Sequence, residues 1–454
     1  MIMYSNKKVI VCGMARSGIS AAELLASVGA DVTIQDIKPL DALEKIHDLD
    51  EMRNKGIKIY AGANPDDIIG QFDYAVMSPG VPCDLPFVKK AEELNVNVIS
   101  EVELAYTLTK CPVCAITGTN GKTTTTTLAG LLLERKYKNT AVVGNIGVAY
   151  SEKALSLTKN DYVCAEISSF QLETSHTFRP HIAAVLNITP DHLNRHKTME
   201  NYVAVKEKIF ANQGKDDFTI LNKNDPCCIR MADKTDGRVF FFSSGEKLDE
   251  GIYLDGDEIH IKWDGLDEDV INVNELKILG VHNYENVMAA VACAVCAGVE
   301  MDEIRDVLRE FNGVEHRIEY CGTFDGVDYY NDSKGTNPDA SIRAVLAMRK
   351  PIVLIGGGYD KGSDYDEWVR LFDGRVKRLV LIGVTAEKIA ACCDKYGFKN
   401  YEFAETFEEC VEKCKAAAKD GDCVLLSPAC ASWGMFEDYE QRGRVFKELI
   451  KKGR

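Results

Sequence analysis

The sequence has no long run of apolar residues. Nothing in its 454 residues approaches the ~18 consecutive apolar residues that a membrane-spanning helix needs. The start, Met1 to Lys8, is short and polar, and the apolar run after it extends only from Val9 to Cys12, so we expect no signal peptide. We therefore predict a cytoplasmic protein without a membrane-inserted segment.

The sequence also lacks an excess of positive charge. It has 54 lysine and arginine residues against 70 aspartate and glutamate residues, a formal net charge of −16. This balance argues against nucleic acid or an anionic membrane as the main partner. A protein of this charge that binds a polyanionic ligand must concentrate positive charge locally, so individual lysine and arginine residues become informative.

The 16 cysteines do not form the pattern of a disulfide framework or a zinc knuckle. Cys12, Cys164 and Cys423 lie within apolar segments, where a thiol acts as a small hydrophobe. Of two C-x-x-C pairs, Cys111/Cys114 begins a predicted strand and Cys293/Cys296 lies in a predicted buried helix. We expect neither pair to hold structural zinc.

Strand and helix signals alternate almost throughout, which is typical of parallel α/β layers. We predict an α/β fold of three domains: an N-terminal Rossmann-like domain (1–106), a central P-loop ATPase-type α/β domain (107–313) and a C-terminal Rossmann-like domain (314–454). The predicted strands comprise residues 8–13, 31–36, 74–77, 96–99, 113–116, 141–143, 162–165, 182–186, 218–221, 327–330, 352–355, 379–382 and 423–426, with a hairpin at 251–263.

The most informative segment is ThrGlyThrAsnGlyLysThrThr at 117–124. It joins an apolar strand to a Thr/Leu/Ala-rich helix that ends near Lys136, so its backbone N–H groups and the helix N-terminus predict a phosphate cradle. The cradle is shortened, because Ile116 occupies the place of the usual first glycine. Lys122 supplies a positive charge and Thr123 a hydroxyl suited to Mg²⁺. We predict ATP binding here.

A second glycine-bearing turn, Gly13-x-Ala15-x-x-Gly18, follows the first predicted strand, and Asp36 ends the next strand. This pattern indicates a nucleotide-binding fold in which the acid meets a ribose. Alanine at the second position of the pattern leaves two readings open. One is NAD(P), and the other is a different nucleotide-like ligand.

Polar loops follow several other predicted strands, and in parallel sheets such loops gather at one edge. Glu166 suits Mg²⁺, and Asp191, His192 and His196 could bind metal or phosphate. The last loops comprise residues 331–339, 356–362 and 427–433. By contrast, Lys206 in a predicted helix reads on its own as a solvated lysine, and Asn283 as a helix cap.

Taken together, these motifs resemble the Mur ligase family, ATP-dependent ligases that join an amino acid to a carboxylate. The resemblance covers essentially the whole chain, in family order. It rests on the 117–124 segment together with GluIleSerSerPheGlnLeu, AsnIleThrProAspHisLeu, HisAsnTyrGluAsn, GluHisArg, AsnAspSerLysGlyThrAsnPro, SerProGlyVal, GlyGlyGlyTyrAspLysGly and SerProAlaCysAlaSerTrp. Within the family, the match implies a monomer that adds D-glutamate to UDP-N-acetylmuramoyl-L-alanine during peptidoglycan precursor synthesis.

The resemblance also implies roles for single residues. Lys122, Glu166, His192 and Lys206 would be catalytic, and Thr123, Glu166, His192 and Lys206 as a carbamate would support two Mg²⁺ ions. The implied ATP contacts are Gly118, Thr119, Asn120, Gly121, Lys122, Thr123, Thr124, Asn283, Asn286, Arg317 and Asp332. The implied substrate contacts are Ala15, Arg16, Asp36, Ser78, Asn145, His192, Lys334, Thr336, Lys361, Ser432 and Tyr439. Position 439 is tyrosine where the family pattern has phenylalanine.

Three alternatives remain at this point. Another amide ligase of the Mur and folylpolyglutamate synthetase superfamily is the nearest, although the folate enzyme lacks a separate N-terminal UDP-binding unit. An NAD(P)-dependent dehydrogenase built on residues 1–105 leaves the later motifs unexplained. A non-catalytic nucleotide-binding regulator would not need Glu166 and His192 as a metal set.

Overall fold

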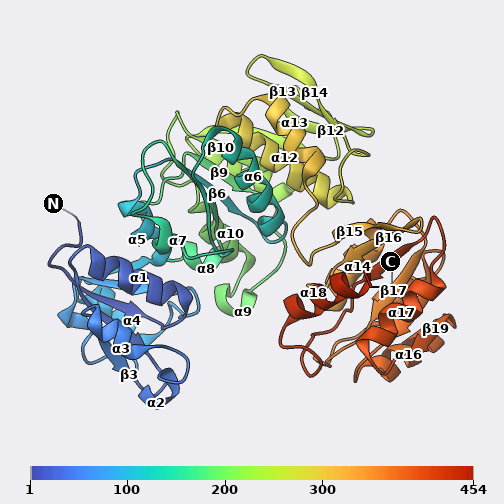
Figure 1. The fold of residues 1–454 in the computed structure, drawn as a ribbon. Coiled ribbons are helices and arrows are strands. Elements are labelled where there is room, and N and C mark those ends of the chain that lie inside the picture. Colours follow the sequence, from blue (N-terminus) through green and yellow to red (C-terminus); the bar gives the residue numbers. More distant parts are fainter. Residues whose placement is uncertain (1–2, 453–454) are drawn as a thin grey trace. The chain divides into compact units, whose positions relative to one another are not determined.

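The computed structural model describes residues 3–452 and contains three β-sheets (Figure 1). These residues divide into two compact units. The first comprises the chain up to Ile271 together with Glu285–Val307, and the second comprises Asn272–Tyr284 together with the chain from Leu308 onward. The predicted three-domain α/β fold is confirmed at the level of its sheets, whereas the boundaries at 106/107 and 313/314 stay predictions.

The first sheet has the strand order β3-β2-β1-β4-β5, and all its strands are parallel. Its strands are β1 (Lys8–Cys12), β2 (Asp31–Asp36), β3 (Lys58–Ala61), β4 (Tyr74–Met77) and β5 (Asn97–Ser100). Its helices are α1 (Arg16–Ser27), α2 (Leu40–Leu43), α3 (Leu49–Asn54), α4 (Pro86–Glu93) and α5 (Glu101–Leu108). The order reverses between β1 and β4, and such a switch point is where open parallel sheets bind ligands.

The second sheet has nine strands in the order β14-β13-β12-β11-β10-β9-β6-β8-β7. Its strands are β6 (Val113–Thr117), β7 (Thr140–Gly144), β8 (Tyr162–Glu166), β9 (Ile182–Val185), β10 (Phe218–Asn222), β11 (Arg238–Ser243), β12 (Gly251–Asp255), β13 (Glu258–Trp263) and β14 (Leu266–Asn272). The strands from β7 to β12 are parallel, and β12 and β13 form the predicted antiparallel hairpin. Strand β6 therefore places the phosphate loop between the ends of β8 and β9.

The helices of residues 122–310 lie between or after these strands in the chain. They are α6 (Lys122–Lys136), α7 (Tyr150–Lys153), α8 (Ser169–Leu172), α9 (Leu193–His196), α10 (Met199–Glu207), α11 (Pro226–Met231), α12 (Val281–Cys296) and α13 (Met301–Glu310). Strand β6 is buried along its whole length because its residues pack into the core on both faces. No helix among residues 3–452 is long and apolar enough to cross a membrane.

The third sheet has the order β15-β16-β20-β17-β18-β19 and is parallel except for the β15–β16 hairpin. Its strands are β15 (Glu319–Phe324), β16 (Val327–Asn331), β17 (Ile352–Gly356), β18 (Val376–Leu381), β19 (Tyr401–Phe403) and β20 (Cys423–Leu426). Its helices are α14 (Pro338–Ala347), α15 (Asp366–Arg370), α16 (Ala386–Lys395), α17 (Phe407–Ala417) and α18 (Tyr439–Leu449). Separate apolar clusters cover its two faces, one around Trp368 and one around Phe446.

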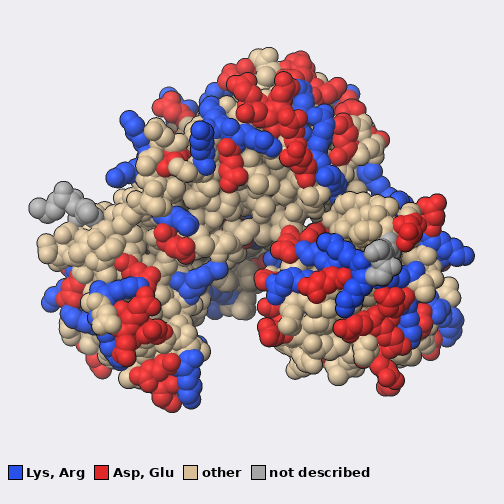
Figure 2. All heavy atoms as spheres, in the orientation of Figure 1, with Lys and Arg blue, Asp and Glu red and all other residues tan. Residues whose placement is uncertain are grey.

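The surface combines charges of both signs. Figure 2 shows lysine and arginine side chains interspersed with aspartate and glutamate over both units on the face that is drawn. Ion pairs such as Lys55 with Glu23 and Lys395 with Asp366 bring opposite charges together. On that face neither sign of charge forms a continuous surface without the other.

Candidate active site

The phosphate loop at 118–121 is held in one conformation by its glycines and by Asn187. Gly118 and Gly121 have φ values of +151° and +84°, which glycine adopts without strain. Asn187, two residues after β9, accepts a hydrogen bond from the Asn120 backbone N–H at 2.8 Å through Oδ1, and its carbonyl accepts from the Thr119 N–H at 2.9 Å. The loop is therefore tied to the end of the neighbouring strand.

Two lysines from different helices meet at this loop. Lys122 Nζ donates to the carbonyl oxygens of Gly118 and Thr119, both at 2.9 Å. Lys206 Nζ donates to the same Gly118 oxygen at 2.9 Å and to Thr117 Oγ1 at 3.2 Å. Two lysine side chains thus converge on a single carbonyl at the start of the phosphate loop.

Lys206 is buried, in contrast to the solvated lysine that its helix suggested from the sequence alone. Its side chain is only 1% exposed, and burial together with the positive charge of Lys122 lowers its pKa to about 7. The negative charges of Asp191 and Glu166 act in the opposite direction. Near neutral pH, much of Lys206 is therefore an uncharged amine, which is a nucleophile.

Glu166 ends β8 with one carboxylate oxygen paired and the other unpaired. Oε1 accepts a hydrogen bond from Asn145 Nδ2 at 2.8 Å, whereas Oε2 is buried without a hydrogen-bond partner. Asn145 itself follows β7, and its backbone N–H donates to the Glu166 carbonyl at 2.9 Å. A buried carboxylate oxygen without a donor is costly unless a cation or proton satisfies it.

His192 lies on the turn before α9 in a left-handed conformation, with a φ of +53°. Its ring centroid is 4.8 Å from that of Phe170, and its Nε2 lies 3.5 Å from Asp191 Oδ2. The segment from Asn187 to His192 is joined to the phosphate loop again through Thr119, whose Oγ1 donates to the Thr189 carbonyl at 3.1 Å. His196 is buried against Ser169, with its Nε2 2.9 Å from the hydroxyl.

Asn286, in α12, completes the phosphate-loop region of the first unit. Thr125 Oγ1 lies 3.3 Å from Asn286 Oδ1. A methyl group on Gly121 would approach this same Oδ1 to 2.1 Å, so the amide lies directly against the loop. Asn283 belongs to the second unit, where its Nδ2 donates to the Leu279 carbonyl at 2.8 Å.

The residues predicted for the UDP substrate gather at the switch point of the first sheet. Ser78 follows β4, and its hydroxyl donates to the Gly13 carbonyl at 3.1 Å. Asp36 Oδ2 accepts from the Met14 backbone N–H at 2.9 Å and thereby fixes the turn after β1. Ala15 and Arg16 lie exposed on this turn.

In the second unit, Asp332 is a buried carboxyl at the end of β16. It accepts from Ser427 Oγ at 2.7 Å and from the Ile318 N–H at 3.3 Å, and burial raises its pKa to about 7. Arg317 is close enough that its positive charge partly offsets this rise. Lys334 and Thr336 follow on the same loop, with Lys334 Nζ 5.6 Å from the Tyr439 ring centre.

The loops after β17 and β20 are joined directly. The Gly357 N–H donates to the Pro428 carbonyl and the Tyr359 N–H to the Ala431 carbonyl, both at 2.9 Å. Lys361 Nζ lies 5.0 Å from the Trp433 ring centre, and Ser432 is buried beside it in sequence. Lys361 and Ser432 are therefore carried by two loops that the backbone holds together.

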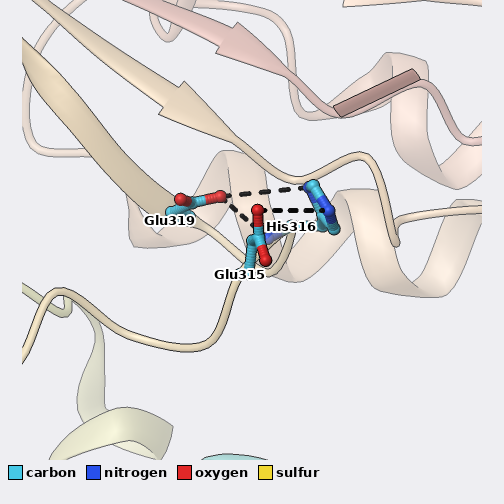
Figure 3. A group of neighbouring side chains, drawn as sticks. All are labelled: Glu315, His316 and Glu319. Atoms are coloured by element: carbon cyan, nitrogen blue, oxygen red, sulfur yellow. Dashed lines mark hydrogen bonds and ion pairs between the residues drawn. The ribbon is translucent and has the colours of Figure 1, made fainter. Parts of the chain in front are cut away.

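Glu315, His316 and Glu319 form a cluster whose ligand atoms lie within 4.8 Å of one another (Figure 3). Lys447 Nζ donates to Glu315 Oε1 at 2.6 Å and to Glu319 Oε1 at 2.9 Å. The positive charge that these carboxylates need is thus supplied by a lysine of α18. This arrangement favours a structural role at the start of β15 over a metal site.

Comparison with known proteins finds three family models that together match most of the chain. Residues 7–100 match the "Mur ligase MurD-like, N-terminal domain", residues 116–294 the "Mur ligase middle domain" and residues 316–430 the "Mur ligase, glutamate ligase domain". The chain belongs to the Mur ligase family. These matches extend over the middle and C-terminal motifs that the alternative of an NAD(P)-dependent dehydrogenase left unexplained.

Relatives within the Mur ligase family match the chain end to end. A protein of Lachnospira eligens named UDP-N-acetylmuramoylalanine–D-glutamate ligase is 49% identical over 445 residues, 98% of both chains. A protein of the same name from Clostridioides difficile is 44% identical over 447 residues, again 98% of both chains.

Solved structures of the Mur ligase family have the same fold. The UDP-N-acetylmuramate-alanine ligase MurC from Thermotoga maritima has a TM-score of 0.59 at 20% identity, covering 99% of this chain and 100% of that one. MurF from Acinetobacter baumannii has a TM-score of 0.61 at 17% identity, covering 94% and 87%. As a member of the Mur ligase family, the chain is an ATP-dependent ligase.

Several residues at the site escaped sequence reasoning. Asn187 is predicted only as part of a motif, yet its amide holds the phosphate loop; its place two residues after β9 is the signal that could have marked it. Arg442 is 1% exposed and donates to Ser333 Oγ at 2.9 Å and to the Cys430 carbonyl at 3.2 Å, joining α18 to two site loops. No periodic pattern marks such an arginine, because its partners come from distant segments.

Proposed function

We propose that this chain joins D-glutamate to UDP-N-acetylmuramoyl-L-alanine with hydrolysis of ATP, a step in the assembly of the peptidoglycan precursor. Full-length relatives at 49% and 44% identity with this name support the choice of substrates. The observation that carries the chemistry is the convergence of Lys122 and a neutralisable Lys206 on the phosphate loop, near Glu166.

The reaction proceeds in two steps. An oxygen of the alanyl carboxylate attacks the γ-phosphorus of ATP, the bond to the bridging oxygen breaks, and ADP leaves. The amine of D-glutamate then attacks the acyl phosphate carbon, phosphate leaves with the bonding electrons, and the amine loses a proton. Negative charge builds up on the transferring group, so a cation held in place, such as Lys122, lowers the barrier.

The residues present fit Mg²⁺, because the buried Oε2 of Glu166 has no other partner and oxygen donors suit this ion. Thr123, Glu166, His192 and Lys206 as a carbamate would hold two ions. Bound Mg²⁺ supplies positive charge that offsets the charge on the phosphoryl group. Asn145 keeps the Glu166 carboxylate oriented through its hydrogen bond to Oε1.

The buried environment of Lys206 suits a carbamate at this residue better than a permanently protonated amine. Its uncharged amine attacks the carbon of CO₂; the C–N bond forms while the electrons of one C–O π bond move to oxygen, and the nitrogen then loses a proton, which leaves a carbamate anion. The carbamate anion is attracted by Lys122, whereas a protonated Lys206 would be repelled by it. Burial at 1% exposure would protect the carbamate from hydrolysis.

The remaining contacts are those that the family resemblance implies. Ala15, Arg16, Asp36 and Ser78 would bind the uridine diphosphate at the switch point of the first sheet, with Asn145 and His192 near the muramoyl portion. Lys334, Thr336, Lys361, Ser432 and Tyr439 would bind D-glutamate. ATP would contact residues 118–124 with Asn283, Asn286, Arg317 and Asp332.

The test is phosphate release from ATP in the presence of UDP-N-acetylmuramoyl-L-alanine and a panel of D- and L-amino acids. We expect release that depends on both the UDP substrate and D-glutamate. Release with another amino acid in preference to D-glutamate would assign a different ligase activity of the family. Release that needs neither substrate would contradict the proposal.

A further inference from the structure

Arg195, in α9, makes contacts that no role described so far explains. Its NH1 donates to the Pro79 carbonyl at 2.9 Å, and its NH2 donates to the Val81 carbonyl at 3.0 Å. Its Nε donates to both carboxylate oxygens of Glu173, at 2.9 and 3.1 Å, and NH2 reaches Glu173 Oε2 at 2.5 Å. Arg195 follows a strand of the second sheet, and its side chain thus binds two backbone carbonyls of the 78–81 loop, which follows a strand of the first sheet.

The 78–81 loop lies against the proposed UDP-substrate turn. Ser78 donates to the Gly13 carbonyl, and a methyl group on Gly13 would lie 3.0 Å from Ser78 Cβ and 3.1 Å from Val81 Cγ2. A shift of the 78–81 loop therefore displaces the turn that carries Ala15 and Arg16. Arg195 fixes this loop from outside the first sheet.

The other side of Arg195 reaches the His192 segment. Its guanidinium carbon lies 4.3 Å from the centre of the Phe170 ring, whose centroid is 4.8 Å from that of His192. The Arg195 backbone N–H also donates to the His192 carbonyl at 3.0 Å. The side chain is 15% exposed and its partner Glu173 12%, so this arrangement is largely shielded from solvent.

We propose that Arg195 is a positioning residue that couples the UDP-substrate loop of the first sheet to the His192 segment beside the phosphate loop. The inference rests on the proposed function, since it concerns the same substrate. Guanidinium geometry is essential here, because a planar fork of donors can hold two carbonyls and a carboxylate together. A lysine ammonium is a point charge and can keep only part of this set.

The test compares Arg195→Met and Arg195→Lys with a matched control, Arg179→Met. Arg179 lies in the same unit, just before β9, and hence at the opposite end of the parallel strands from the phosphate loop. Its Nε donates to Asp217 Oδ2 at 2.7 Å. Binding of UDP-N-acetylmuramoyl-L-alanine is measured by calorimetry without ATP, and binding of a non-hydrolysable ATP analogue separately. KM and kcat for each substrate and the melting temperature complete the set.

We expect both Arg195 variants to weaken UDP-substrate binding by about tenfold or more, the loss typical of a hydrogen bond from a charged donor. KM for the UDP substrate should rise and kcat should fall, while binding of the ATP analogue stays as in the unaltered chain. Arg195→Lys should resemble Arg195→Met more than the unaltered chain. Arg179→Met should lower only the melting temperature.

Folded Arg195 variants with unchanged UDP-substrate binding would overturn the proposal, and so would failure of both variants to fold, since either result leaves Arg195 a structural role only. An unaltered chain that binds the UDP substrate but does not ligate D-glutamate would refute the proposed function instead. Because calorimetry measures substrate binding without turnover, the two failures are distinguishable.

Discussion

Replacement of Lys206 tests the central claim about the phosphate loop. An ordinary lysine, with a pKa near 10.4, has only about one neutral amine in a thousand at pH 7.5. With its pKa lowered to about 7, a substantial fraction of Lys206 is neutral at that pH, which increases the reactive amine by roughly two to three orders of magnitude. Lys206→Ala removes this amine and the anion that it would form with CO₂.

We expect Lys206→Ala to lower kcat about 100- to 1,000-fold, the range for loss of one charge-stabilising group in an active site. Acetate or other short carboxylic acids should restore part of the activity, because the space left by the side chain can admit a carboxylate in place of the carbamate. Phosphate release with UDP-N-acetylmuramoyl-L-alanine and D-glutamate is the assay. The unaltered enzyme should depend increasingly on added bicarbonate as the pH falls below 7, where its amine becomes protonated.

The matched control is Lys234→Ala. This change removes a half-exposed lysine that forms an ion pair with Glu207, the last residue of the helix α10 that carries Lys206. Carbon-13 NMR with labelled bicarbonate should show a carbamate signal in the control and in the unaltered enzyme, and none in Lys206→Ala. If Lys206→Ala is as active as the control, or if the labelled signal persists in it, the reasoning from burial and repulsion is wrong.

Three further predictions concern the remaining charged groups. Lys122→Ala should abolish ligation yet keep calorimetric binding of the UDP substrate, because it removes a cation at the phosphate loop but no contact in the first sheet; near-normal turnover would refute its assignment. Lys361→Met should raise KM for D-glutamate about 10- to 150-fold, the equivalent of one charge-assisted hydrogen bond, and a rise in KM for ATP alone would place the residue at the nucleotide instead. Asp332 has a pKa of about 7 in the folded chain against 3.8 for an unperturbed carboxyl, so folding favours its protonated form. Its contribution to the free energy of unfolding is therefore fully present below about pH 4 and is lost as the pH rises through 7, a total change on the order of 4 kcal/mol. Thermal unfolding between pH 5 and 8 should therefore show a steeper fall for the unaltered chain than for Asp332→Asn, and equal slopes would contradict the burial argument.

The strands that carry the site were predictable because each is a short apolar run that ends in a polar loop. Strands β4, β6 and β8 lie where the sequence indicated, and so do the helices α1 and α6. The unpredicted strands are β3, β11, β14, β15 and β19. Strands β3, β14, β15 and β19 lie at or near sheet edges, where partial exposure replaces the apolar run with mixed residues such as LeuAspGluAspValIleAsn in β14.

The site residues also divide into those that the local sequence predicts and those that it does not. Lys122 and Glu166 were predictable from the residues alone, because Lys122 begins the helix after the glycine-bearing loop that follows one apolar strand, and Glu166 ends another. Lys206 needed the family resemblance, since α10 has a weak apolar face and nothing local reveals that its lysine is buried. Arg195 could not be found, because its partners Pro79 and Val81 are more than 100 residues away and bind through backbone carbonyls that any sequence provides.

The tight contact at Gly121 bears on how this enzyme could escape inhibition. A side chain at this position would be strained at a φ of +84° and would also collide with Asn286, which itself lies against the loop. A compound that hydrogen-bonds the backbone of residues 118–121 would contact atoms that no codon change can remove without distorting the loop. Resistance to such a compound would have to arise elsewhere, through altered uptake, efflux or expression, or through substitutions at the rim of the site.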